Sequence, residues 1–245
     1  MLLENLAYTE VEDYLKKKDI VLIPIGSVEQ HSPYGLIGTD FIISEAVARA
    51  VGEAMTILVA PTIAYGVSPH HMAFKGTVSL NPNTMMGVIS DIVQSFVAHG
   101  FKRILFVNGH GGNITPLKTA FKQLKAENIP GYFDVISWYD SNKVRKACKD
   151  AFRDKEGRHA TPSEVSLTKF TRPAEFATKA VDQKTVAKPK YYWPLSGEEM
   201  RSVFPDGRME SAPWLATEEK GRLIMAKAVE ALEKKIKEII KLKIL

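Results

Sequence analysis

Carboxylate and imidazole side chains occur at three places in this chain, each at the end of a predicted strand or the start of a predicted helix. Glu29 and His31 follow one apolar run, Asp40 precedes a helical pattern, and His110 follows a second apolar run within the glycine-rich segment 109–113. These side chains are ligands of divalent Zn, Mn and Fe. Residues two apart in extended backbone point to the same side, so Glu29 and His31 can reach one cavity. The pattern predicts a metal site.

Each of these residues also has a plain structural interpretation. Asp40 could cap a helix, and a lone buried histidine is more often a satisfied structural residue than a ligand. The segment 109–113 could instead cradle a phosphate, which leaves a non-catalytic nucleotide- or phosphate-binding protein as an alternative. That segment lacks the P-loop lysine and the G-x-G-x-x-G spacing. The joint occurrence of the four residues after consecutive predicted strands favours a metal.

The elements that must position these residues alternate along the chain. A buried strand is predicted at 20–25 and further strands at 55–61, 104–107 and 132–137; helices are predicted at 41–54, from 83 or 84 to 99, and from 113 to 126. Helical patterns follow at 143–154, after Ser163 and from Thr217, with an irregular segment at 173–213. Alternating strands and helices predict an α/β fold: a three-layer αβα sandwich with a mostly parallel sheet. Without a visible repeat or linker, we expect residues 1–245 to form one domain.

Composition narrows the class of protein. The chain has 245 residues, is 45% apolar and 25% charged, and carries a formal net charge of +5. Its basic excess lies mostly in the last helix without interleaved aromatics, which indicates a solvated helix face and no nucleic-acid partner. No apolar run is long enough for a membrane span, and a lone Cys148 fits a cytoplasmic protein. There is no G-x-S-x-G, and Cys148 has no histidine near it in sequence.

Longer motifs resemble one known family. The segments 23–31, Thr39-Asp40, Gly66-Val67-Ser68 with His70-His71, Gly76-Thr77 and Asn108-Gly109-His110-Gly111-Gly112-Asn113 are similar to those of the creatininase (creatinine amidohydrolase) family along almost the whole chain. The resemblance implies a metal-dependent hydrolase of a non-peptide C–N bond in a small cyclic or formyl amide. It also implies a sandwich-like α/β fold and a homo-oligomer, often a hexamer.

The resemblance further implies two divalent ions, which could be Zn, Mn or Fe. Glu29, Asp40 and His110 would hold one ion, while His31 and Asp40 would hold the second. Two ions sharing a carboxylate would lower the pKa of a bound water and polarise the amide carbonyl. The same resemblance makes Ser68, His70, His71 and Trp193 candidates for lining the substrate pocket, although His70 and His71 could equally form an ordinary polar loop.

This sequence departs from creatininase at the last metal position. Creatininase has a glutamate two residues past the last histidine, where this chain has Gly112. The segment 159–166 offers a replacement, because it retains His159 and Glu164 of an element found in many relatives. Pro162 replaces the first glutamate of that element.

We expect Glu164 to be a metal ligand and His159 or Glu164 to pass a proton to the leaving nitrogen. An equally open interpretation of Glu164 is a helix-start residue near the dipole. The variant element is closer to the archaeal formamide hydrolase of flavin and deazaflavin biosynthesis, which makes a formylamino-pyrimidine ribotide deformylase the alternative enzyme. Lys75 would then be a candidate for meeting the substrate phosphate.

Overall fold

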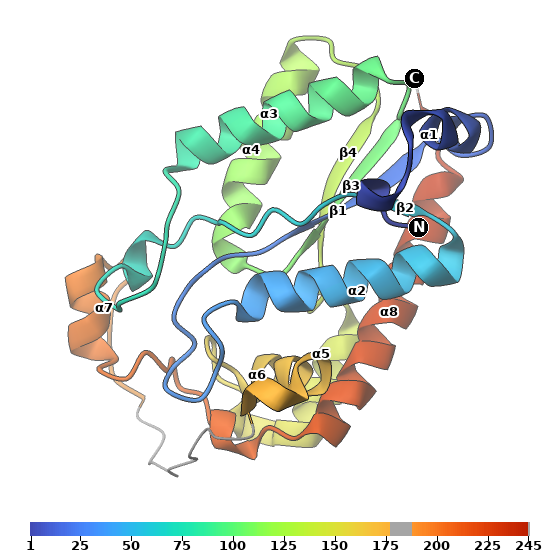
Figure 1. Ribbon diagram of the computed structural model, residues 1–245. Coiled ribbons are helices and arrows are strands. Elements are labelled where there is room, and N and C mark those ends of the chain that lie inside the picture. Colours follow the sequence, from blue (N-terminus) through green and yellow to red (C-terminus); the bar gives the residue numbers. More distant parts are fainter. Residues whose placement is uncertain (177–187, 245) are drawn as a thin grey trace.

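A computed structural model describes residues 1–176 and 188–244 of the chain. Its sheet contains four strands in the order β2-β1-β3-β4: β1 (Ile20–Ile25), β2 (Leu58–Val59), β3 (Arg103–Asn108) and β4 (Tyr132–Ser137). All three pairings are parallel, and Ile25, Asn108 and Ser137 lie in register. The carboxyl ends of β1, β3 and β4 therefore meet at one edge of the sheet (Figure 1).

Helices cover both faces of this sheet, as Figure 1 shows. One face packs against α1 (Tyr8–Leu15), α3 (Pro82–Ala98) and α4 (Ile114–Ala126). The other packs against α2 (Thr39–Met55), α5 (Asn142–Phe152), α6 (Pro162–Thr171) and α8 (Glu218–Ile240). The remaining α7 (Gly197–Val203) contacts the 3-10 turn Pro69–His71. The three-layer α/β fold with a parallel sheet is thereby confirmed.

The strand β1 is apolar throughout because both of its faces are buried. Ile20 and Leu22 belong to the core beneath α2 and α8, whereas Val21, Ile23 and Ile25 belong to the core beneath α3 and α4. All are at most 2% exposed. A strand buried on both faces has no polar side to alternate with, which is typical of a sheet between two helical layers.

Two helices begin slightly earlier than the sequence predicts. The cap of α3 is Asn81, whose side chain accepts a hydrogen bond from the Asn83 amide, rather than Asn83 or Thr84. The cap of α6 is Thr161, rather than Ser163. In both helices a proline occupies the first helical position, where its missing N–H costs no hydrogen bond, so the helix starts before the predicted cap.

Two further predictions need correction. The second strand spans only Leu58–Val59 instead of 55–61, because α2 continues to Met55 and Thr56 turns the chain in a left-handed conformation. The segment 173–213, predicted to be irregular, contains α7; its part 177–187 lies outside the described residues. Within the described residues, no helix has the length and apolarity to cross a membrane.

Candidate metal centre

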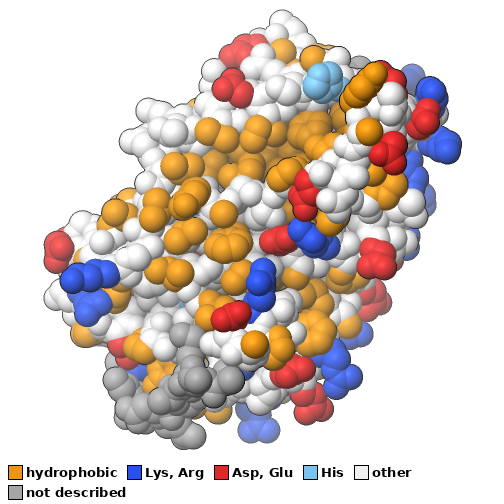
Figure 2. All heavy atoms as spheres, in the orientation of Figure 1, with side chains coloured by type: hydrophobic (Ala, Val, Ile, Leu, Met, Phe, Trp, Pro, Cys, Tyr) orange, Lys and Arg blue, Asp and Glu red, His pale blue; other side chains and the backbone are white. Residues whose placement is uncertain are grey.

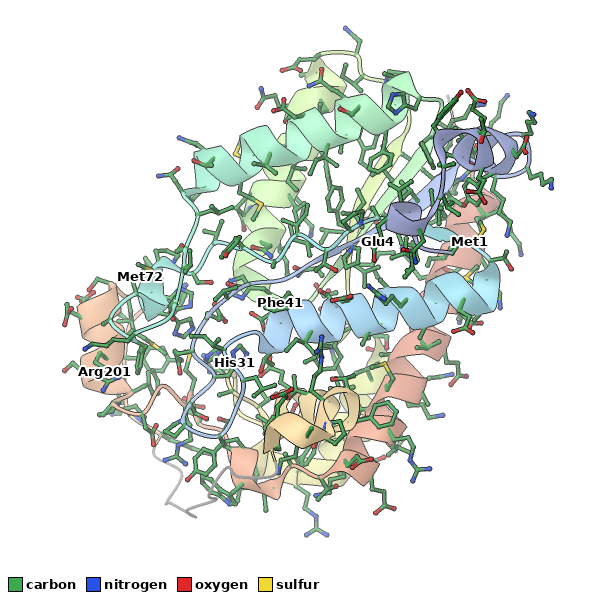
Figure 3. All side chains as sticks on the ribbon, in the orientation of Figure 1. Met1, Glu4, His31, Phe41, Met72 and Arg201 are labelled. Carbon is green, nitrogen blue, oxygen red and sulfur yellow. The ribbon has the colours of Figure 1, made fainter. Side chains whose placement is uncertain are left out.

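The candidate ligands come from three elements that end or begin at the same edge of the sheet. Glu29 and His31 lie in the loop after β1, His110 follows β3, and Asp40 occupies the first turn of α2. Figure 3 shows His31 beside the N-terminal end of α2, near Phe41. The cap position of that helix is Gly38, so Asp40 is not the N-cap, and its carboxylate lies at the positive end of the helix dipole.

Together with Glu164, these four side chains form two groups that share Asp40. His110 Nδ1 lies 3.2 Å from Glu29 Oε1 and 3.1 Å from Asp40 Oδ2. On the other side of the same carboxylate, His31 Nε2 lies 3.2 Å from Asp40 Oδ1 and 4.0 Å from Glu164 Oε2. In each group the ligand atoms lie within 4.8 Å of one another. This spacing would let each group surround one ion.

Several of these buried atoms lack a hydrogen-bond partner in the described part of the chain. Glu29 Oε2, His31 Nε2 and Asp40 Oδ2 are three of only six such side-chain atoms. Burying an ionisable atom without a hydrogen bond is costly, even where an oppositely charged side chain lies nearby, as it does for His31 Nε2 and Asp40 Oδ2. Their concentration in one cluster, with oxygen and imidazole donors, fits a site built for divalent ions.

Three histidine rings of the cluster are each oriented by a backbone carbonyl. Each ring places one nitrogen against a backbone carbonyl: His31 Nδ1 at 3.2 Å from Glu29, His110 Nε2 at 3.0 Å from Val67, and His159 Nε2 at 2.7 Å from Gln30. A carbonyl can only accept, so these nitrogens carry the N–H. The other nitrogen of each ring faces carboxylates and can offer a lone pair, which is the usual arrangement of metal-binding histidines.

In the absence of metal ions, the carboxylates of the cluster favour protonation of the neighbouring histidines. Burial opposes ionisation of Glu29, but the nearby His110 outweighs it and lowers the pKa of Glu29 to about 2. Burial also opposes a charge on His31, yet Asp40 raises the pKa of its imidazole to about 10. By the same balance, the pKa of His110 is raised, mainly by Glu29. A divalent ion would have to displace these protons, so its binding is coupled to pH.

Glycines and an asparagine fix the loop after β3 against its neighbours. A Cβ at Gly109 would lie 2.1 Å from the Asp40 carbonyl oxygen. A Cβ at Gly112 would lie 2.2 Å from the Val67 carbonyl oxygen and 2.4 Å from His110 Nε2, so this loop conformation leaves no room for a side chain at that position. Asn113 follows at the predicted cap position of α4, but its side chain makes no cap; it accepts from the Val67 amide instead.

Glu164 lies at the start of α6 and has two kinds of neighbour. Its Oε2 accepts a hydrogen bond of 2.7 Å from the Thr161 amide, completing a capping box. The same oxygen lies 4.0 Å from His31 Nε2, and Glu164 forms a candidate metal group with His31 and Asp40. The two interpretations of this residue are therefore compatible.

A cavity of about 860 Å³ opens over the cluster. His159 lines it with Nδ1 at 3.6 Å from Glu29 Oε1, and burial together with His31 lowers the pKa of its imidazole to about 3. His70, His71 and Trp193 also line it. Ser68, expected in the pocket lining, is fully buried behind His110, with Oγ at 3.2 Å from His110 Nε2.

One wall of the cavity is basic, which the sequence motifs do not predict. It is lined by the basic residues Arg145, Lys149, Arg153 and Arg158. The first three are spaced four apart, and this spacing was a usable signal, although solvated helix faces share it. Lys75, the expected phosphate contact, is exposed and is not among the residues that line the cavity.

Comparisons with known proteins identify the family of this chain. The creatininase model, described as creatinine amidohydrolase, matches residues 4–236. The mycofactocin precursor peptide peptidase of Mycobacterium ulcerans (strain Agy99) is 33% identical over 220 residues, covering 86% of this chain and 81% of that protein. Creatinine amidohydrolase of Pseudomonas putida is 28% identical over 251 residues, covering 96% and 95%. The solved structure "Creatininase Mn" has a TM-score of 0.82 at 25% identity, covering 98% of this chain and 99% of that one.

Proposed function

The chain belongs to the creatininase family of metal-dependent amidohydrolases, and we propose that it cleaves a non-peptide C–N bond in a cyclic amide or formamide. The observation that carries this proposal is the pair of carboxylate–histidine groups that share Asp40 beneath one cavity. We further propose that residues 1–245 act as a single domain, and that the reaction takes place in the cytoplasm.

We assign two divalent ions to these groups. Glu29, Asp40 and His110 would hold one ion, and His31, Asp40 and Glu164 the other. When bound, such ions would supply a hydroxide nucleophile at neutral pH and polarise the scissile carbonyl. Zn, Mn and Fe all suit histidine and carboxylate donors. The solved creatininase structure with manganese in its name supports a metal of this kind.

His159 is suited to move the proton. Its Nε2–H is held by the Gln30 carbonyl, so Nδ1 of the neutral ring carries the lone pair and can accept a proton from the attacking water. The same atom can then return that proton to the leaving nitrogen. Glu164, whose pKa burial raises, is the alternative donor.

A second candidate reaction is deformylation of a formylamino-pyrimidine ribotide. The basic wall favours it, because four cations beside the cavity would attract a phosphate. The cavity lining also includes His70 and Trp193, whose ring centroids lie 5.0 Å apart and which offer aromatic surface to a heterocycle. A non-catalytic phosphate-binding protein would use the same wall but would not require the two ligand groups.

The test is a hydrolysis panel on protein loaded separately with Zn, Mn and Fe. Cyclic ureas, lactams, formamides and a formylamino-pyrimidine ribotide represent the proposed substrates; short peptides represent the activity named for the mycobacterial relative. Metal-dependent turnover of any non-peptide amide supports the proposal. Hydrolysis of peptides alone would show that the proposed substrate class, non-peptide amides, is wrong. Absence of bound metal together with stabilisation by phosphate would point to the binding protein.

A further inference from the structure

Gln30 lies between the proposed ligands Glu29 and His31 and is itself buried. The orientation of its side-chain amide is fixed at both ends. Oε1 accepts a 2.8 Å hydrogen bond from the Ser32 amide, and Nε2 donates a 3.0 Å hydrogen bond to the Gly207 carbonyl. A backbone N–H can only donate and a carbonyl can only accept, so the amide cannot be turned over without losing both bonds.

This orientation determines the tautomer of His71. Gln30 Nε2 also lies 3.0 Å from His71 Nδ1. Because that amide nitrogen is a donor, His71 Nδ1 must accept, and the hydrogen of the neutral imidazole resides on Nε2. His71 therefore differs from His31, His110 and His159, whose nitrogens facing the carboxylates are free of hydrogen when neutral.

The Nε2–H of His71 is left available at the cavity. It lies 3.9 Å from Glu29 Oε1, which is too far for a hydrogen bond, and no other described residue accepts it. The ring is held in place by stacking on His159, with centroids 4.2 Å apart and planes 27° apart. His71 is only 1% exposed, yet it lines the cavity over the metal groups.

We propose that Gln30 is a positioning residue that keeps His71 in its Nε2–H form, and that His71 donates this hydrogen to the carbonyl oxygen of the substrate. The inference rests on the proposed amide hydrolysis. Negative charge develops on that oxygen during attack, and a fixed donor in a buried site stabilises it without reorganisation. The ring gains and loses no proton in this role.

The tautomer can be read directly by ¹⁵N NMR of histidine-labelled, zinc-loaded protein. The wild type should show His71 with protonated Nε2 and bare Nδ1. Gln30→Glu replaces the donor with an acceptor, so Nδ1 should become protonated, while about two zinc equivalents stay bound. Gln30→Met removes the hydrogen bond without adding charge and should yield a mixture of tautomers. A wild-type ring protonated on Nδ1 alone, or a ring unchanged in both variants, would overturn the assignment.

The donor role needs a carbonyl at the site, and formamide serves as the probe. Titrating it into the zinc-loaded wild type should shift the His71 Nε2–H resonance, and the shift should vanish in Gln30→Glu. On the fastest substrate of the hydrolysis panel, Gln30→Glu should lower kcat roughly 100-fold and change KM less. Gln94→Glu, which adds the same charge on the exposed face of α3, should behave as wild type.

These readouts separate the two proposals. If no amide is hydrolysed, the proposed function fails, while the NMR spectra still decide the tautomer. If amides are hydrolysed but formamide leaves the His71 N–H unshifted, or Gln30→Glu keeps full kcat, then the donor role is wrong and the amidohydrolase remains.

Discussion

Glu164 combines a structural and a proposed chemical role in one carboxylate. Glu164→Gln should preserve the helix start, since glutamine also completes a capping box, but it removes the charge beside His31. We expect one of two ions to bind more weakly, with the group of Glu29, Asp40 and His110 still loaded. Calorimetric titration of metal into the stripped variant would show one tight and one weakened site.

Activity of this variant should return at least partly at high metal concentration, because the lost affinity is compensated by mass action. Two sites of wild-type affinity in Glu164→Gln would mean that the residue only caps α6. A general loss of both sites would instead indicate that the variant disturbs the shared ligand Asp40.

Glu156 is a second partly buried acid that lines the cavity. Its Oε1 accepts a hydrogen bond from Ser163, its Oε2 has no partner in the described residues, and burial raises its pKa to about 7. The folded protein thus holds this proton more tightly than the unfolded chain, whose carboxyl has the ordinary value of 4.5. The free energy of unfolding should therefore fall as pH rises from 4.5 to about 7.

Glu156→Gln removes this dependence. The free energy of unfolding of the variant minus that of the wild type should therefore increase from pH 5 to pH 8, by at most about 3 kcal/mol. Urea unfolding of metal-stripped protein at both pH values measures the gain. An equal difference between variant and wild type at the two pH values would contradict a raised pKa at Glu156.

At the scale of elements, α5 presents two kinds of lysine. Lys146 is paired with Asp150 at 2.7 Å and lies outside the cavity lining, whereas Lys149 lines the cavity and has no ion pair among the described residues. If the basic wall binds an anionic group, Lys149→Ala should raise KM for a phosphate-bearing formamide about tenfold and leave kcat nearly unchanged. Steady-state kinetics at low salt would measure it.

Lys146→Ala is the matched control on the same helix and should change neither constant. A neutral formamide should be insensitive to both substitutions, and added salt should shrink the effect at Lys149. Equal KM changes for neutral and phosphorylated formamides would rule out an anion contact.

The secondary-structure elements also show which features of the fold and the site can be predicted from the sequence. The strands at 20–25 and 132–137 have the bounds that the sequence predicts, because largely apolar runs between turn signals specify strands whether they are fully buried, as β1 is, or partly buried, as β4 is. The carboxyl ends of the strands predicted at 20–25 and 104–107 locate the loops that carry Glu29, His31 and His110. The roles of Gln30 could not be predicted, since its partners His71 and Gly207 are distant in sequence. The basic spacing on α5 is equally typical of a solvated helix.

At the scale of the whole molecule, apolar surface remains exposed. Tyr192 is 67% and Trp193 55% exposed. A groove of about 800 Å³ between α1 and α3 is lined by apolar residues that include Leu3 and Phe96 (Figure 2). Monomeric proteins seldom expose large contiguous apolar patches.

We therefore predict a homo-oligomer, as the family resemblance implies, with a hexamer as the expected state. Light scattering coupled to size exclusion should give a mass of six chains of 27.3 kDa at micromolar concentration. A particle with the mass of one chain would contradict the prediction.

The central claim is that Asp40 joins two ions into one hydrolytic site. The most direct measurement is metal content per chain by elemental analysis, in the wild type and in Asp40→Asn. The variant keeps the shape of the side chain but removes the charge between His31 and His110. We expect about two equivalents in the wild type, a clear loss in the variant, and unchanged circular dichroism. Full metal occupancy in Asp40→Asn would contradict the shared-ligand site.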